Sequence, residues 1–175
     1  TILALPGALS MPVLDRDEAR FSQASSQMLE TGDFVVIRFH DGLRNKKPVG
    51  IHWLQAASVA AVSDVEERQI WAFRLPSLLG AILAAWATYW GGRTLFSPRA
   101  AFAGSLLLSA TLLFSSEAHI AKTDAVLVGF VCLSMAALAH MRRLRLQDTG
   151  LVPLDKFSLG PKLLGLIFWF AVGAG

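Results

Sequence analysis

The sequence predicts an all-α membrane protein, with several transmembrane helices and two amphipathic helices that lie in the membrane interface. Composition is the first reason, because 54% of the 175 residues are hydrophobic and only 17% are charged, an unusual balance for a soluble domain. Distribution is the second, because the apolar residues form long uncharged runs and the charged residues gather between them. The single cysteine, Cys132, lies within such a run and indicates neither a disulfide framework nor a cysteine metal site.

Uncharged runs of about the length that a membrane helix needs, roughly 17–25 residues, occupy three segments of the chain, and a fourth run begins at residue 163. Membrane helices are therefore expected at residues 75–92, 100–116, 125–141 and 163–175, the last of them truncated. Residues 1–14 are also apolar. They lack the basic flank and small-residue cleavage site of a signal peptide, so we expect them to end a truncated first membrane helix. Residues 1–175 would then form the N-terminal part of a larger transmembrane domain.

Basic residues predict how these helices are oriented. Short cytoplasmic loops of membrane proteins are enriched in Lys and Arg, and the short loops around residues 92–99 and 142–162 carry them here. Alternation then places the long polar segment 15–74 and the short turn 117–124 on the non-cytoplasmic side. Segment 15–74 also holds eight Lys and Arg residues, but long loops are exempt from this rule. The formal net charge of +3 does not indicate nucleic-acid binding, because no basic face is interleaved with aromatic residues.

The first interfacial helix is expected at the start of segment 15–74. Asp15 can cap its N-terminus, and Glu18, three residues later, would complete an acidic capping box. Gly32 would end this helix, whose apolar face is formed at helical spacing by Phe21, Ala24, Ser25, Met28 and Leu29. A helix of this kind lies in the membrane interface rather than crossing the bilayer.

A second interfacial helix is expected after a short β-like run at residues 34–39 and a turn at residues 40–42. Pro48 suits its first turn, and Trp53 suits the interface. Its apolar face would consist of Ile51, Leu54, Ala57, Ser58, Ala61 and Val62. Together, the two helices would make a platform at the membrane surface.

Segment 15–74 also concentrates opposed charges beside an apolar run, which in a membrane protein favours a charged ligand over a solvated surface. The charged residues of interest are Asp17, Glu18, Arg20, Lys46 and Lys47. Acidic residues are favoured in the first turn of any helix, which is sufficient to explain Asp15 and Glu18. It accounts neither for Asp17 nor for the lysines. From these residues alone, the structural and the functional interpretations have equal weight.

A second polar cluster occupies the turn 117–124, on the same side of the membrane, and comprises Glu117, His119, Lys122 and Asp124. One interpretation is a solvated turn in which Thr123 or Asp124 caps the following helix. The other is that the turn completes a ligand cavity, with Lys122 or Asp124 contacting the ligand. The sequence identifies no certain cofactor, and a divalent metal between Asp17 and Asp124 is an alternative that the spacing does not demand.

Several short motifs resemble one family in their order and spacing. They are Asp-Glu-Ala-Arg-Phe at 17–21, Gln-Met-Leu-Glu-Thr-Gly-Asp-Phe at 27–34, Lys-Lys-Pro-Val-Gly-Ile-His-Trp-Leu at 46–54, Arg-Leu-Pro-Ser at 74–77 and Ala-Lys-Thr-Asp-Ala at 121–125. The chain resembles, over nearly its whole length, the GT-C-fold glycosyltransferases of the protein O-mannosyltransferase and aminoarabinose transferase superfamily.

The resemblance implies a multi-pass enzyme of the bacterial inner (cell) membrane that takes a sugar from a polyprenyl-phosphate carrier on the periplasmic side. The acceptor would be a lipid, a glycan or a protein. The family's acidic residue corresponds to Asp17, and its phosphate-contacting basic residues correspond to Arg20 and Lys47. Several aminoarabinose transferases have Glu before the Lys-Pro pair and an aromatic residue before the Trp. Lys46 and His52 occupy those positions here, which leaves the donor sugar and the acceptor open.

The chemistry of glycosyl transfer agrees with these residues. Asp17 could act as the base that activates an acceptor hydroxyl, a role worth ~10²–10⁴-fold in rate, with Glu18 as a supporting acid. Arg20 and Lys47 could stabilise the lipid phosphate as it leaves. Further candidates for substrate binding are Lys46, His52, Lys122 and Asp124.

Two other classes of protein are alternatives. A transporter or flippase of lipid-linked sugars would place ionisable groups at mid-membrane depth and show broken-helix repeats. The runs at 75–92, 100–116 and 125–141 are free of charged residues, which favours the enzyme. A membrane-anchored binding or scaffold module is the third possibility.

Overall fold

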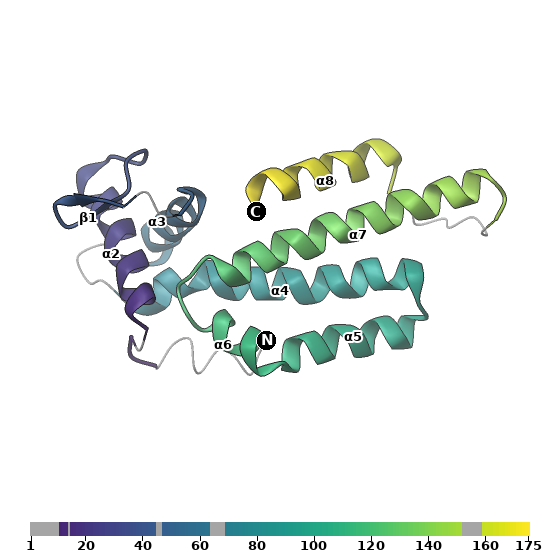
Figure 1. Ribbon diagram of the computed structural model, residues 1–175, viewed down its shortest axis with the longest axis horizontal. Helices are drawn as coiled ribbons and strands as arrows, with labels where there is room; N and C mark the ends of the chain where they lie inside the picture. Colours follow the sequence, from purple (N-terminus) through teal and green to yellow (C-terminus); the bar gives the residue numbers. More distant parts are fainter. Residues whose placement is uncertain (1–10, 14, 45–46, 64–68, 152–158) are drawn as a thin grey trace. The chain divides into compact units, whose positions relative to one another are not determined.

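The computed structural model describes residues 11–13, 15–44, 47–63, 69–151 and 159–175 (Figure 1). Most of these residues are helical, as predicted, and the helices are α2 (Arg16–Thr31), α3 (Gly50–Val62), α4 (Ile70–Leu95), α5 (Pro98–Ala110), α6 (Leu112–Ala118), α7 (Asp124–Asp148) and α8 (Pro161–Ala174). A hairpin of β1 (Arg38–Phe39) and β2 (Gly42–Leu43) lies between α2 and α3 in the sequence. Most of the predicted first membrane helix, at residues 1–10 and 14, and the candidate Lys46 lie outside the described residues.

The chain forms two compact units. The first contains the described residues up to Gly80 together with Leu112–Val126, and the second contains Ala81–Thr111 and Leu127–Gly175. Helices α4 and α7 each contribute residues to both. All the predicted site residues that the structure describes belong to the first unit.

Helix α2 has the ends that its sequence predicts. The Asp15 carboxylate accepts a hydrogen bond from the backbone N–H of Asp17 at 2.7 Å, which satisfies one of the free N–H groups of the first turn. Gly32 ends the helix with a φ of +69°, and its N–H donates to the carbonyl of Met28 at 2.9 Å. Glycine adopts this left-handed conformation without steric cost. The residues Phe21 and Ala24 of the predicted apolar face are buried.

The predicted β-like run is shorter than expected. Only Arg38 and Phe39 pair with the returning strand, opposite Leu43 and Gly42. Earlier in the run, the Asp33 carboxylate accepts hydrogen bonds from the N–H groups of residues 35 and 36, both at 3.1 Å, and this local turn competes with extended pairing. The hairpin turn is fixed to α2, because both side-chain amide atoms of Gln27 bond the backbone of His40, at 3.0 and 3.1 Å.

Helix α3 begins later than predicted, and the structure shows which of its sides is buried. The buried side of this helix consists of Ile51, His52, Gln55, Ala56 and Val59, whereas Trp53, Leu54, Ala57, Ala61 and Val62 are exposed. The polar residues His52 and Gln55 face inward because they have hydrogen-bond partners there. In lipid an outward-facing apolar stripe loses nothing by exposure. Pro48 precedes the N-cap residue Val49 instead of lying in the first turn.

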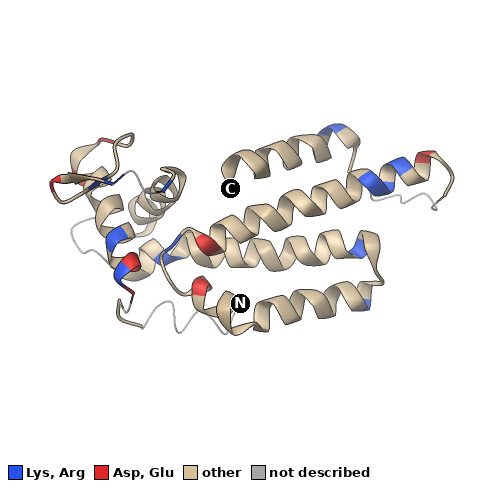
Figure 2. Cartoon of the chain, viewed as in Figure 1, with Lys and Arg blue, Asp and Glu red and all other residues tan. Residues whose placement is uncertain are grey.

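Two of the described helices, α4 and α7, are long and apolar enough to cross a membrane. Their charged residues lie near their ends, and the middle of each is free of charge (Figure 2). Helix α4 begins before the predicted run 75–92 and therefore contains Arg74, and α7 extends past the predicted end at residue 141.

The single helix expected at residues 100–116 is divided into α5 and α6. The backbone is extended at Thr111 (φ −66°, ψ 134°). Nearby hydroxyl groups bond backbone carbonyls: Ser109 Oγ donates to the carbonyl of Ser105 at 2.9 Å, and Thr111 Oγ1 donates to that of Leu108 at 2.8 Å. Such bonds compete with regular helix geometry.

Small residues let the helices of the second unit approach closely. A Cβ on Gly91 would lie 2.8 Å from the Cα of Ala136, and one on Gly92 would lie 3.1 Å from the Cβ of Ala101. Ser105 Oγ donates to the backbone carbonyl of Ala85 at 2.7 Å. Close packing of small residues with an interhelical hydrogen bond is typical of membrane helices.

Candidate functional site

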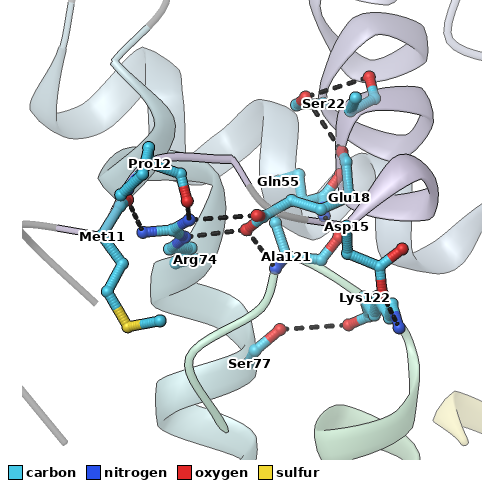
Figure 3. Close-up of polar contacts among 11 residues, drawn as sticks. Met11, Pro12, Asp15, Glu18, Ser22, Gln55, Arg74, Ser77, Ala121 and Lys122 are labelled. Carbon is cyan, nitrogen blue, oxygen red and sulfur yellow. Dashed lines mark hydrogen bonds and ion pairs between the residues drawn. The ribbon is translucent and has the colours of Figure 1, made fainter. Parts of the chain in front are cut away.

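Glu18 forms a buried ion pair with Arg74 in the first unit (Figure 3). Arg74 Nε donates to Glu18 Oε1 at 2.7 Å, and Nη2 donates to Oε2 at 3.0 Å. The two side chains are 1% and 2% exposed. Arg74 also donates to the backbone carbonyls of Met11 and Pro12, at 2.7 and 3.2 Å. Bidentate pairing in a site without water gives strong and directional contacts.

The predicted capping box is wrong in its second half. Asp15 caps α2 as expected, but the Glu18 carboxylate turns inward to Arg74 instead of returning to the helix start. Glu18 Oε1 also accepts the backbone N–H of Ala121 at 2.9 Å. The spacing of Asp15 and Glu18 could not reveal these partners, which lie far along the sequence.

The turn between α6 and α7 is held by α2, α3 and α4. Besides the bond to Glu18, the Ala121 carbonyl accepts from Gln55 Nε2 at 3.2 Å, and the Lys122 carbonyl accepts from Ser77 Oγ at 3.1 Å. These contacts converge on the backbone of two consecutive residues, Ala121 and Lys122 (Figure 3).

Lys122 forms an ion pair with Asp15, and its Nζ lies 4.0 Å from Glu117 Oε1. The hydrogen bond from Lys122, followed by that from the N–H of Asp17, lowers the pKa of Asp15. Partial burial opposes the charge of Lys122, but the bond to Asp15 and the charge of Glu117 outweigh it, so the pKa of Lys122 is raised. Lys122 therefore keeps its positive charge at neutral pH.

His52 lies inside the packing of α2 against α3, with none of its surface exposed. Its ring stacks on Phe21 with 5.3 Å between centroids. Ser25 Oγ donates to Gln55 Oε1 at 2.7 Å and lies 2.9 Å from His52 Nδ1. Because the hydroxyl proton is used toward Gln55, we assign a proton to Nδ1, which donates to Ser25.

Burial, and next the charge of Arg44, lower the pKa of His52 to about 4, so the ring is neutral at pH 7. Among the residues that the structure describes, its Nε2 atom has no hydrogen-bond partner. The sequence predicted a substrate-binding residue here; the structure shows a side chain whose contacts are with the residues of α2 and α3.

Asp17 and Arg20 lie at the surface of α2. Asp17 has 52% of its side chain exposed and Arg20 33%, and Arg20 Nη1 lies 3.4 Å from Asp17 Oδ1. Lys47 and Asp124 are exposed as well. The structure therefore joins the two predicted clusters at the start of α2: Asp15 bonds both the N–H of Asp17 and the side chain of Lys122.

No group of three or more His, Cys, Asp or Glu side chains in the described part of the chain could hold a metal ion. Sequence reasoning missed the structural importance of Arg74, Gln55 and Ser25. An arginine that begins a long apolar run was a usable signal for Arg74, because ionisable groups in membrane helices are expensive unless paired. No local pattern pointed to Gln55 or Ser25.

Comparison with known proteins gives one family match. The model of the family described as dolichyl-phosphate-mannose-protein mannosyltransferase matches residues 46–149. This range covers α3 and α4, the turn that carries Lys122, and α7.

The chain is also similar to curated bacterial proteins. It is 31% identical over 123 residues to undecaprenyl phosphate-alpha-4-amino-4-deoxy-L-arabinose arabinosyl transferase 1 of Pseudomonas fluorescens (strain Pf0-1), covering 70% of this chain and 21% of the relative. It is 31% identical over 160 residues to the corresponding protein of Pseudomonas aeruginosa (strain PAO1), covering 87% of this chain and 28% of the relative. The chain thus spans only about a fifth to three tenths of the length of these relatives.

Among solved structures, ArnT from Cupriavidus metallidurans has a similar fold. Its apo crystal structure matches with a TM-score of 0.81 at 23% identity, over 98% of this chain and 30% of that one. The crystal structure of the same protein bound to undecaprenyl phosphate matches with a TM-score of 0.80 at 22% identity, over the same shares.

Proposed function

This chain belongs to the dolichyl-phosphate-mannose-protein mannosyltransferase family, and from this premise we propose that it forms part of an integral membrane glycosyltransferase. The enzyme moves a sugar from a polyprenyl-phosphate donor to an acceptor on the non-cytoplasmic face. Membership of the family also confirms the resemblance read from the sequence motifs. The similarity to aminoarabinose transferases and the likeness to the fold of ArnT support the same proposal.

The donor is proposed to be a sugar on undecaprenyl phosphate or a related polyprenyl phosphate. The names of the curated relatives specify undecaprenyl phosphate, and one of the similar crystal structures holds that lipid. The acceptor is proposed to be a lipid, a glycan or a protein. The protein would reside in a bacterial inner membrane with segment 15–74 facing the periplasm, which the basic loops of the sequence support.

The observation that carries the proposal is the arrangement of the two adjacent acids of α2. Asp17 is exposed beside Arg20, whereas Glu18 is buried against Arg74. Asp17 is thus free to accept a proton from an acceptor hydroxyl, whose oxygen would attack the anomeric carbon of the donor sugar. The sugar–phosphate bond would break with its electron pair on the phosphate oxygen. Arg20 and Lys47, both accessible to a ligand, would stabilise that charge.

Glu18 is proposed to support the site and not to transfer the proton. Its two carboxylate oxygens already accept hydrogen bonds from Arg74 and from the N–H of Ala121. The side chain is also buried, so an acceptor hydroxyl cannot reach it. Lys122 and Asp124 lie on the turn held next to α2 and are proposed to contact the acceptor or the phosphate. Lys46 and His52 stay candidates for substrate selection.

The experiment is a transfer assay with the full-length protein reconstituted in lipid vesicles. Polyprenyl-phosphate-linked aminoarabinose and mannose, each radiolabelled in the sugar, serve as donors. We expect the label to leave the lipid phosphate and appear on the acceptor, and Lys47→Ala to weaken use of the donor. Movement of the intact labelled lipid across the bilayer without transfer would indicate a flippase. Binding of the labelled lipid without sugar transfer and without movement across the bilayer would indicate a scaffold.

A further inference from the structure

The backbone N–H and the backbone carbonyl of Ala121 are each bonded by a side chain of another helix. Its N–H donates to Glu18 Oε1 at 2.9 Å, and its carbonyl accepts from Gln55 Nε2 at 3.2 Å. Ala121 is completely buried. Gln55 is itself oriented, because its Oε1 atom accepts the hydroxyl proton of Ser25 at 2.7 Å. The backbone position of Ala121 is therefore fixed by side chains of α2 and α3 together (Figure 3).

Stability alone does not explain why the Glu18 position carries a charge. Removing two ionised groups from water is expensive, and a well-packed apolar pair in place of a buried ion pair is often neutral or stabilising. Glu18 and Arg74 are nevertheless only 1% and 2% exposed. An apolar side chain at position 18 could fill the space, but it could not accept the N–H of Ala121. By accepting this N–H, the Glu18 carboxylate fixes the position of the turn between α6 and α7.

The hydrogen bond between Glu18 and Ala121 joins the direct neighbours of two candidate site residues, the exposed Asp17 and the partly buried Lys122. Glu18 follows Asp17 in α2, and consecutive helical residues point about 100° apart, so one acid faces inward while the other faces outward. Ala121 directly precedes Lys122 in the turn. The remaining donors of Arg74 bond the carbonyls of Met11 and Pro12, which hold the segment just before α2. Fixing Glu18 to Ala121 therefore fixes Asp17 relative to Lys122.

We propose that Glu18, Arg74 and Gln55 are positioning residues for the transfer reaction. They keep the turn of Lys122 and Asp124 at a set distance from Asp17, and this role rests on the proposed function. Reacting groups must be placed closely, because a displacement of about 1 Å can lower a rate ~100-fold. Loss of the anchor on Ala121 lowers the transfer rate even where the fold survives.

A double variant separates positioning from mere stability. The single changes Glu18→Leu and Arg74→Met each leave a buried charge unpaired, so each lowers thermal stability. The double variant Glu18→Leu/Arg74→Met removes both charges and recovers thermal stability, but it leaves the N–H of Ala121 without an acceptor. In the full-length protein, hydrogen–deuterium exchange should then rise at residues 119–123, and the transfer rate should stay at least ~10-fold below that of the unmodified protein. A double variant with unchanged exchange or an unchanged rate would overturn the proposal.

Two further variants complete the test. Gln55→Met removes the donor to the Ala121 carbonyl with little change in volume, and it should also raise exchange at residues 119–123 and lower the rate. Ser105→Ala is the matched control, because it removes a hydroxyl donor to a backbone carbonyl in the second unit and should change neither. An unmodified protein that transfers no sugar would overturn the proposed function. Normal transfer in the unmodified protein and in Gln55→Met would instead overturn the role of Gln55 alone.

Discussion

At the scale of single residues, two adjacent acids have opposite environments. Asp17 is half exposed and lies 3.4 Å from a surface arginine, whereas Glu18 is buried and accepts hydrogen bonds from a guanidinium and a backbone N–H. A proton acceptor must reach its substrate, and a structural carboxylate must keep its partners. The two positions are therefore expected to respond differently to the same change from acid to amide.

Asp17→Asn should lower turnover by ~100-fold or more if Asp17 is the base, because the amide cannot take a proton from the acceptor. Stability should hardly change, since an exposed ion pair such as that with Arg20 contributes little, typically about 0–1 kcal/mol. Transfer assays and thermal unfolding of the full-length protein measure the two effects. Near-normal turnover in this variant would remove Asp17 from the proposed chemistry.

Glu18→Gln should instead destabilise the protein. The sequence suggested only the loss of a helix cap, worth ~0.5–2 kcal/mol. The structure raises that expectation, because the change leaves the buried charge of Arg74 without its counter-ion, and breaking such a pair costs about 3–5 kcal/mol. The free energy of unfolding should fall accordingly, with Asp17→Asn as the matched neighbouring control. Equal stability of the two variants would contradict the buried pair.

At the scale of elements, α2 and α3 are joined by buried polar contacts. Ser25, His52 and Gln55 form a chain of hydrogen bonds between the two helices. The imidazole in this arrangement is neutral, because burial holds the pKa of His52 at about 4 instead of its ordinary 6.5.

The packing of α2 on α3 should weaken in acid. The unfolded chain takes up a proton on His52 below pH 6.5 while the folded chain does not until about pH 4. The contribution of neutral, buried His52 to the free energy of unfolding is therefore fully present above pH 6.5. It is lost as the pH falls toward 4, at up to about 1.4 kcal/mol per pH unit. Thermal unfolding measured between pH 7 and pH 4, at intervals, tests this slope.

His52→Gln removes the titration while keeping a side-chain donor for Ser25. The variant is expected to have lower stability at pH 7 but a flatter dependence on pH across this window. An unchanged slope would assign the acid sensitivity to other groups.

At the scale of the whole molecule, the charged residues of the long apolar helices α4 and α7 lie near the helix ends (Figure 2). Two of the described helices are long and apolar enough to cross a membrane. The density of Lys and Arg in the loop at 142–162 predicts that segment 15–74 lies on the opposite side of the membrane from that loop.

A reporter fused after Gly42, in the exposed hairpin, should be active only outside the cytoplasm. A single cysteine at the same position should react with a membrane-impermeant reagent from the periplasmic side, and one in place of Arg145 should not. Labelling of the Gly42 position from the cytoplasm would reverse the predicted orientation.

The sequence by itself determined the helical class, both ends of α2 and the membrane character of α4 and α7. These features depend on local properties: a capping acid, a glycine that tolerates positive φ, and uninterrupted apolar runs. Motifs that resemble a family also identified Asp17 and Lys47 as candidate site residues. The roles of these residues stay predictions.

Only the tertiary structure decided what Glu18 does and how α3 faces. Glu18 meets Arg74 and Ala121, which are 56 and 103 residues away, and no local pattern encodes contacts over such separations. For α3, periodicity identified an apolar stripe but not the side that packs on the rest of the protein. His52 and Gln55 lie on the buried side, beside apolar residues, because their hydrogen-bond partners lie there and a buried polar group without a partner is costly.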